Sequence, residues 1–459
     1  MRMFWATGMG AAALGFLLGI HTAIAAVSPE EANRLGGDLT PIGAEKAGNA
    51  AGTIPAWDGG LTAPPPGITL DPSKHLPDPF AADQPLYTVS AANMAQYDAQ
   101  LTEGQKGLVS AYPDSYLMKV YPTHRSCALP AHVYEALKRN AVTGQLVNNG
   151  NGVTGATMGP PFPIPQSARE VLWNNELNYR GFKVWRHNAS AAPTQNGDFT
   201  IDVAVDQYIY SWSDPSMTAT EDMKNISYYF LKQGLSPPSN SGAMTVFNNT
   251  LDQVAEERRV WNYRPGERKV KRTMGIGYDN LVPSSEGIRA SDTFQIFNGA
   301  ADRYDWKLIG KQEKLIAYNT NGFASSEYQY KDILNKHHLN QDPMRYELHR
   351  VWVIEGKVKP GMSHVFASRR RIYLDEDSWV AVAADLYGQT DSLSRVQEAH
   401  IFNYYNEPLC AIGSEIIYDI NGGRYHVVGL RNQQRPVKFD VSLNQRKFSP
   451  YGIRTLGAR

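Results

Sequence analysis

The stretch YELHRVWVIEGKV, from Tyr346 to Val358, shows most directly how this chain folds. Leu348 and Trp352 point to one side of an extended chain, and Val351 and Val353 point to the other. This period of two is typical of a β-strand, and both of its faces are partly apolar. A sheet that is apolar on both faces must be covered on both sides or must hold a ligand on one. The stretch therefore supports a binding hypothesis.

The same period continues through the C-terminal half, from about Phe199 to Leu430. Strands are predicted at residues 199–212, 226–232, 243–248, 258–263, 269–273, 307–318, 346–358, 364–374, 379–387, 395–406, 415–420 and 424–430. Turn sequences such as RPGE at 264–267 and NGG at 421–423 separate neighbouring strands. Long consecutive strands joined by tight turns cannot be parallel. We therefore expect one large antiparallel meander that must curl or close.

Helices and irregular segments are expected before residue 199. Residues 26–88 have Pro and Gly at short intervals, which indicates an extended strap on the folded body, with a short helix after Ser28. Helices are predicted from Ser90 to about Ala111 and from Pro130 to about Leu146. The match of GNGVTG at 150–155 to GxGxxG is weak, because the Pro-rich PPFPIP follows where a dinucleotide site needs a helix.

The composition limits the class of protein. The 459 residues include 45 Lys and Arg against 45 Asp and Glu, and 42% are hydrophobic. A chain of this kind can bury enough surface to fold without disulfides. Its zero net charge gives the whole molecule no reason to bind nucleic acid or an anionic membrane. The 25 Tyr, 15 Phe and 9 Trp favour strands and apolar pockets.

Residues 1–25 have the pattern of a signal peptide. Arg2 precedes an apolar run, and small residues stand before an expected cleavage site after Ala25 or Ala26. The apolar run, of about 12 to 15 residues, is shorter than the roughly 20 that span a bilayer. We therefore expect a soluble mature chain without a transmembrane segment, exported to the periplasm and either free there or peripheral to the outer membrane.

Export changes the interpretation of Cys127 and Cys410. In an oxidising compartment two cysteines can form a disulfide or remain thiols, and the sequence leaves both open. A disulfide would close a loop of roughly 300 residues and stabilise the fold by about 4 to 5 kcal/mol in the loop-entropy description. A nucleophilic Cys127, with His124 three residues earlier, is disfavoured, because such a cysteine usually takes its His partner from elsewhere in the fold.

The charged motifs do not match a known catalytic or metal site. No GxSxG, HExxH or P-loop sequence occurs, and we predict no catalytic residue, metal or cofactor. The acidic residues DED at 375–377 suit Ca²⁺ in kind, but three adjacent side chains do not easily converge on one ion, so an acidic turn is favoured. The basic stretch 264–272 is interpreted as a hairpin that faces anionic lipid head groups or a partner protein.

Seven stretches carry a resemblance to a known family. They are YPTHRSCALP (121–130), GPPFPIP (159–165), VLWNNELNYRG (171–181), WNYRPGERKVKR (261–272), FNGAADRYDWKLIGKQE (297–313), RYELHRVWVIEGKVKPG (345–361) and RRRIYLDEDSWVAVAADLY (369–387). Their order and spacing resemble, over nearly the whole mature chain, the bacterial periplasmic family called the thirteen-twenty-nine domain of unknown function. That family is related to the LolA/LolB type of lipoprotein carrier.

The resemblance implies both a fold and a task. The fold is a β-rich α+β domain over residues 89–459, in which a large curved antiparallel sheet or incomplete barrel wraps around helices and has an apolar cavity on its concave side. The helical part would span about 89–180 and the meander about 199–430, followed by a tail at 431–459. The task is carriage of lipids or other hydrophobic compounds across the cell envelope, with a transporter of the resistance-nodulation-division type and an outer-membrane partner.

The first functional hypothesis is therefore a carrier whose groove shields apolar cargo from water, at about 25 cal/mol per Å² covered. Five aromatic residues are the candidate ligand-binding side chains, although each can equally be core filler: Trp212, Tyr228, Trp261, Trp306 and Trp352.

The alternative is an exported hydrolase-like enzyme that acts on a hydrophobic substrate. It would need two titratable groups in one cleft with separated pKa values. The carboxylates considered for these roles are Asp302, Asp305, Glu347 and Glu355. The sequence favours the carrier.

Overall fold

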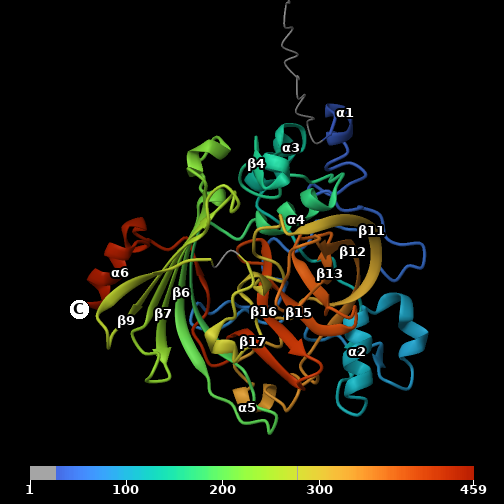
Figure 1. Cartoon of the computed structure of the whole chain (residues 1–459). Coiled ribbons are helices and arrows are strands. Elements are labelled where there is room, and N and C mark those ends of the chain that lie inside the picture. Colours follow the sequence, from blue (N-terminus) through green and yellow to red (C-terminus); the bar gives the residue numbers. More distant parts are fainter. Residues whose placement is uncertain (1–26, 276–277, 459) are drawn as a thin grey trace, which may run out of the picture.

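The main feature of the computed structural model, which describes residues 27–275 and 278–458, is a 16-stranded sheet (Figure 1). The expected signal peptide and its cleavage site lie outside the described residues. The strands of the sheet are β1 (Tyr87–Val89), β2 (Met118–Val120), β5 (Lys183–Ala191), β6 (Asp202–Tyr210), β7 (Ile226–Ser236), β8 (Met244–Thr250), β9 (Arg259–Arg264), β10 (Lys269–Thr273), β11 (Tyr304–Ala317), β12 (Tyr346–Val358), β13 (Arg369–Asp375), β14 (Ala381–Tyr387), β15 (Leu393–Tyr404), β16 (Leu409–Asp419), β17 (Arg424–Leu430) and β18 (Lys438–Phe439).

The remaining elements are short. A separate hairpin consists of β3 (Gln145–Val147) and β4 (Gly152–Thr154). The α-helices are α1 (Pro29–Ala32), α2 (Glu103–Ala111), α3 (Ala131–Thr143), α4 (Ala168–Glu176), α5 (Tyr330–Ile333) and α6 (Pro450–Gly457). Among these helices of the described chain, none has both the length and the apolar content needed to cross a bilayer.

The strand order corrects the prediction of one continuous meander. Strands β5 to β10 form one antiparallel run and β11 to β17 form a second, but β10 and β11 are not neighbours. The two runs instead join where β17 pairs with β5, the first strand of the first run. The sheet is thus β-rich and mostly antiparallel, as predicted, and it is not closed into a barrel. One parallel bridge, between Val120 of β2 and Tyr346 of β12, makes it mixed.

The helices pack onto the sheet at several places. Helix α2 lies against β14 and β15, and α6 lies against β8, β9 and β10. In Figure 1 these two helices stand at opposite sides of the molecule. Helix α4 packs against β11 and β12 through apolar residues such as Val171 and Leu172.

Two local differences from the sequence prediction have clear causes. The helix expected over 90–111 is divided into a 3-10 helix, η1 (Met94–Gln100), and α2. The division occurs because Thr102 and Gln105 form a capping box that starts a new helix. Strand β5 was not predicted, since its sequence KVWRHNASA is largely polar. It becomes a strand because β6 and β17 pair with it on both sides.

The N-terminal strap, residues 27–86, is held by side chains from the body of the protein. Arg125 donates to the carbonyl oxygen of Glu45 (2.8 Å), and Arg350 donates to that of Ala47 (2.6 Å). The indole of Trp379 donates to the carbonyl oxygen of Ile42 (2.9 Å). Buried donors thus satisfy backbone carbonyls that the irregular strap cannot pair within itself.

Cys127 and Cys410 form a disulfide, with 5.6 Å between their Cα atoms. Cys410 lies in β16, and Cys127 lies in the irregular segment between β2 and α3. Both are buried among apolar residues of β11 to β15. The bond therefore fixes an N-terminal segment to the C-terminal run of strands.

Candidate functional site

Five aromatic rings share one face of strands β6, β7 and β8. Tyr208, Phe230 and Phe247 stand side by side across the three strands, and Tyr210 and Tyr228 form the next row. Neighbouring ring centroids are 4.6 Å apart for Tyr208 and Phe230 and 5.8 Å apart for Tyr210 and Tyr228. Tyr208 is buried and the other four rings are only partly buried. We call these five residues the aromatic face.

The opposite face of the same strands is covered by the C-terminal tail. Ile209, Leu231 and Val246 pack there against Phe448, which precedes α6, and Ile453, which lies within α6. The alternation along β6 to β8 therefore gives one sheet face to the core under α6 and the other to the aromatic face.

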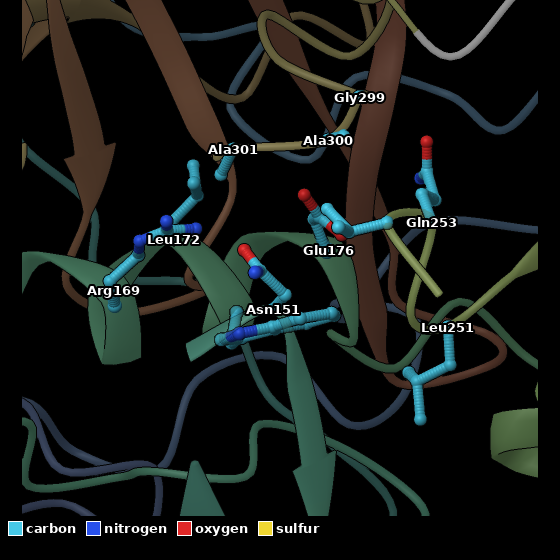
Figure 2. A pocket seen from close by; sticks show the side chains of 11 residues that line it. Asn151, Arg169, Leu172, Glu176, Leu251, Gln253, Gly299, Ala300 and Ala301 are labelled. Carbon is cyan, nitrogen blue, oxygen red and sulfur yellow. The ribbon is translucent and has the colours of Figure 1, made fainter. Parts of the chain in front are cut away.

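Two narrow cavities lie along α4, and the second of them adjoins the aromatic face. They share the lining residues Trp173, Glu176 and Leu251, and Tyr228 lines the second cavity. Figure 2 shows Asn151 and Glu176 in the middle of the first cavity, with Arg169 on one side and Gln253 and Leu251 on the other. Helix α4, strands β7 and β8 and the 295–301 segment thus meet around one carboxylate.

Hydrogen bonds fix the position of α4. Ser167 caps its first turn by accepting from the amide of Glu170. Near its end, Asn174 accepts from the amide of Phe162 and donates to the carbonyl of the same residue, at 2.9 and 2.7 Å. Asn175 accepts from the amide of Ala381 in β14 (2.8 Å). These buried bonds to two distant segments hold Glu176 at the cavity.

Burial raises the pKa of Glu176 to about 7, against the attraction of Arg258, Arg169 and Arg180. Arg180 donates only to backbone oxygens, those of Asn175 (2.7 Å) and Glu176 (3.2 Å). A carboxyl group that titrates near neutral pH can exchange a proton with a bound molecule. The cavity is therefore a polar, titratable pocket next to an apolar surface.

The cavity also contains amide groups without partners. The side-chain oxygens of Asn151 and Gln253 are buried and have no hydrogen-bond partner among the described residues. Both residues line the first cavity. Because a buried polar atom without a partner costs free energy, these two amides are suited to contact a polar group that enters the cavity.

The five aromatic residues singled out in the sequence lie in different places. Tyr228 lines the second cavity and accepts a hydrogen bond from Asn298 (3.2 Å). Trp212 is buried and donates to the carbonyl of Gly159 (2.9 Å), and Trp261 lies on the face under α6. Trp306 donates to the carbonyl of Ala301 (2.9 Å), and Trp352 stacks on Trp379. The structure does not bring these five together.

The acidic triplet 375–377 lies in the turn between β13 and β14 and is buried. His349, Asp375 and Asp377 offer ligand atoms that all lie within 4.8 Å of one another. Arg125 donates to both carboxylate oxygens of Asp377, at 2.9 and 2.7 Å, while burial raises the pKa of Asp375. Since a guanidinium already neutralises Asp377, we interpret this group as part of a buried ion-pair network.

The residues of the cavity were not singled out in the sequence. Glu176, Arg169 and Arg180 occur at ordinary spacing around a short helix, and such charges are usually solvated. The stretch WNNELNYR at 173–180 is mostly polar, which favours a solvated segment. The partners that bury it come from residues 249–254 and 295–301, which no local pattern identifies.

Comparison with known proteins places the chain in a family. The model of the family described as "Protein of unknown function (DUF1329)" matches residues 88–454. The chain belongs to this family. It is also 41% identical over 437 residues to an uncharacterized protein of Pseudomonas aeruginosa, with 95% of each chain covered.

Three solved structures are similar to this chain. A putative outer membrane lipoprotein-sorting protein domain from Vibrio parahaemolyticus is 10% identical, with 62% of this chain and 97% of that chain covered and a TM-score of 0.43. A DUF1329 family protein from Desulfovibrio piger is 14% identical, with 62% and 95% covered and a TM-score of 0.41. A LolA superfamily protein from Nitrosomonas europaea is 12% identical, with 62% and 97% covered and a TM-score of 0.34.

Proposed function

We propose that the protein binds a hydrophobic molecule on its aromatic face and carries it. The observation that supports this proposal is the row of rings on β6 to β8, of which four are only partly buried. Each aromatic side chain can contribute about 150 to 250 Å² of contact. Covering the exposed part of such a surface is favourable by about 25 cal/mol per Å².

The place of action that we propose is the periplasm, where the molecule would be a lipid or another apolar compound in transit across the envelope. The pattern of residues 1–25 supports export. A transporter of the resistance-nodulation-division type and an outer-membrane protein are the proposed donor and acceptor, on the ground of the family resemblance. Because the sequence has no nucleotide-binding motif, the direction of transfer would come from those partners.

We propose a binding protein rather than a hydrolase. Acid–base hydrolysis needs two titratable groups that converge on a substrate. Among the described residues, the lining of the two cavities includes one carboxylate, Glu176, and no histidine. Glu347 and Glu355 lie eight residues apart on β12, which separates them by about 26 Å at about 3.3 Å per residue.

The proposal is tested with N-phenyl-1-naphthylamine, an apolar dye that fluoresces when it leaves water. Phe230 and Tyr229 are neighbours on β7 and point to opposite faces. Phe230→Ala should weaken dye binding about tenfold, since one lost ring contact corresponds to about 1.4 kcal/mol. Tyr229→Ala is the matched control and should leave binding unchanged. No binding by the wild type, or equal effects of the two variants, would contradict the proposal.

A further inference from the structure

The cavity beside the aromatic face is surrounded by more positive than negative charge. Arg169 and Arg180 line the two cavities, and Arg258 exerts the largest attraction on Glu176 among the three. Arg258 donates to the side-chain oxygens of Asn249 and Asn298, each at 2.6 Å. A guanidinium group stays charged in a protein. Three cations therefore lie near Glu176, the one carboxylate among the described lining residues, whose own charge is disfavoured by burial. Asp302 also attracts Arg169.

These arginines differ from those that form the buried ion pairs of the sheet. Arg289 donates to the carboxylate of Glu415 (3.0 Å) and Arg370 to that of Asp292 (2.9 Å). None of the three arginines at the cavity has a described carboxylate oxygen within 4.0 Å. Arg258 is buried, and Arg169 and Arg180 are partly buried. Because a cation that is removed from water without an anion is costly, this site favours the arrival of a negatively charged group.

Size and hydrogen bonding limit which anion fits. Both cavities are narrow and have room for a group of a few atoms rather than for an acyl chain. The unpartnered side-chain oxygens of Asn151 and Gln253 accept hydrogen bonds, so the donors for an anion at this site are the guanidinium groups of Arg169 and Arg180. A planar carboxylate matches both the narrow space and the fork of a guanidinium.

The cavity is continuous with the aromatic face through Tyr228. This residue lines the second cavity, and its ring lies 5.8 Å from that of Tyr210 and 6.4 Å from that of Tyr208. Asn298 connects the two regions, because it accepts from Arg258 and donates to the hydroxyl of Tyr228. A molecule with a charged end and an apolar body would contact both regions at once.

We propose that these adjoining cavities bind the carboxylate of an amphipathic acid. Arg169 lines the first cavity and Arg180 the second, Arg258 adds positive charge nearby, and the aromatic face is the surface for the apolar body. The inference rests on the proposed function, since it assigns a chemical class to the same hydrophobic molecule. It also gives the molecule one orientation, with the acid group at the end of α4 and the chain directed along β7 toward Phe247.

The test compares 11-(dansylamino)undecanoic acid with its methyl ester on the full mature chain. The acid should bind about tenfold more tightly than the ester, because the ester cannot accept one charge-assisted hydrogen bond that the acid accepts. Among the described residues, Arg169 has no side-chain hydrogen bond or ion pair that the fold would lose. Arg169→Met should therefore weaken binding of the acid by a similar factor, about tenfold, and leave the ester unchanged. Arg139→Met, an exposed change on α3, is the control.

The outcomes separate this inference from the function on which it rests. Equal affinity for acid and ester, with no effect of Arg169→Met, would overturn the carboxylate site and leave the aromatic face intact. Binding of neither compound would overturn the proposed function itself. In competition, dodecanoate should displace the dansyl acid more effectively than dodecyl phosphate does, and the reverse order would contradict a carboxylate site.

Discussion

At the scale of single residues, Glu176 determines the chemistry of the cavity. Its side chain lies among apolar residues and near three arginines. The effect of burial on its pKa exceeds the attraction of the arginines, so the pKa rises to about 7 from an ordinary value of 4.5. A carboxyl group whose pKa is raised by folding stabilises the folded protein. This stabilisation is fully present at pH values below the ordinary pKa of the group. That contribution is lost as the pH rises through the folded value.

Glu176→Gln should therefore make unfolding less dependent on pH. At pH 5 the wild type and the variant should have similar free energies of unfolding, because the wild-type carboxyl group is protonated in the fold. At pH 8 the variant should be more stable, by about 1 to 3 kcal/mol at 1.36 kcal/mol per pKa unit. Urea unfolding at the two pH values measures this, and an equal difference at both would refute the assigned pKa.

Several residue-level features were predictable and others were not. The sequence raised the pairing of Cys127 with Cys410 as one of two alternatives, and the structure contains that disulfide. The burial of Glu176 was not predictable, because it depends on segments 249–254 and 295–301 closing over α4. The aromatic candidates were chosen by residue type, and only their strand register decides which of them share a face.

At the scale of elements, the strap depends on donors from the body. Arg350 contacts the carboxylate of Glu376 at 2.9 Å and the carbonyl of Ala47 at 2.6 Å. It therefore joins an irregular segment to the turn between β13 and β14. The strap's own backbone hydrogen bonds are mostly short-range turns, such as that from Thr40 to Ala44. The loss of a donor from the body should therefore loosen it locally.

Arg350→Met should destabilise the protein by about 2 kcal/mol, less than the 3 to 5 kcal/mol for breaking a buried pair, because Lys311 still neutralises Glu376 at 2.9 Å. Limited proteolysis should show new cleavage within residues 41–57. Arg34→Met is the matched control in the same strap, since the Arg34–Asp38 pair is exposed and should contribute less than about 1 kcal/mol. Equal sensitivity of both variants would contradict this account of the strap.

Element boundaries illustrate which physical signals act locally. The expected ranges of β10, β12 and β17 agree with the structure, because each is bordered at one end by a turn sequence. The break before α2 was encoded locally as well, in the capping box of Thr102 and Gln105. Strand β5 has no such signal, and its pairing with β17 links residues more than 200 positions apart.

At the scale of the whole molecule, the disulfide connects the segment between β2 and α3 to strand β16. It closes a loop between positions separated by 283 residues. Reduction, or replacement of both cysteines by Ser, should lower the free energy of unfolding by about 4 to 5 kcal/mol in the loop-entropy description. Urea unfolding with and without reductant tests this. Two titratable thiols in the unreduced, denatured protein would contradict the bond.

In the proposed function, the two runs of strands have different tasks. The run β11 to β17 contains the disulfide and most of the buried ion pairs, and the run β5 to β10 carries the aromatic face. A sheet with one face covered by α6 and the other partly open can bind an apolar molecule without rearranging its core. Binding is thus assigned to one half of the sheet and stability largely to the other.

The most direct test of binding is to ask what the protein carries when it is purified from its native periplasm. Organic-solvent extraction followed by mass spectrometry should release an amphipathic acid in a nearly stoichiometric amount from the wild type. Much less should come from Phe230→Ala, and the wild-type amount from Tyr229→Ala. A wild-type protein that releases no hydrophobic molecule, and that also fails to bind the apolar dye, would contradict the account.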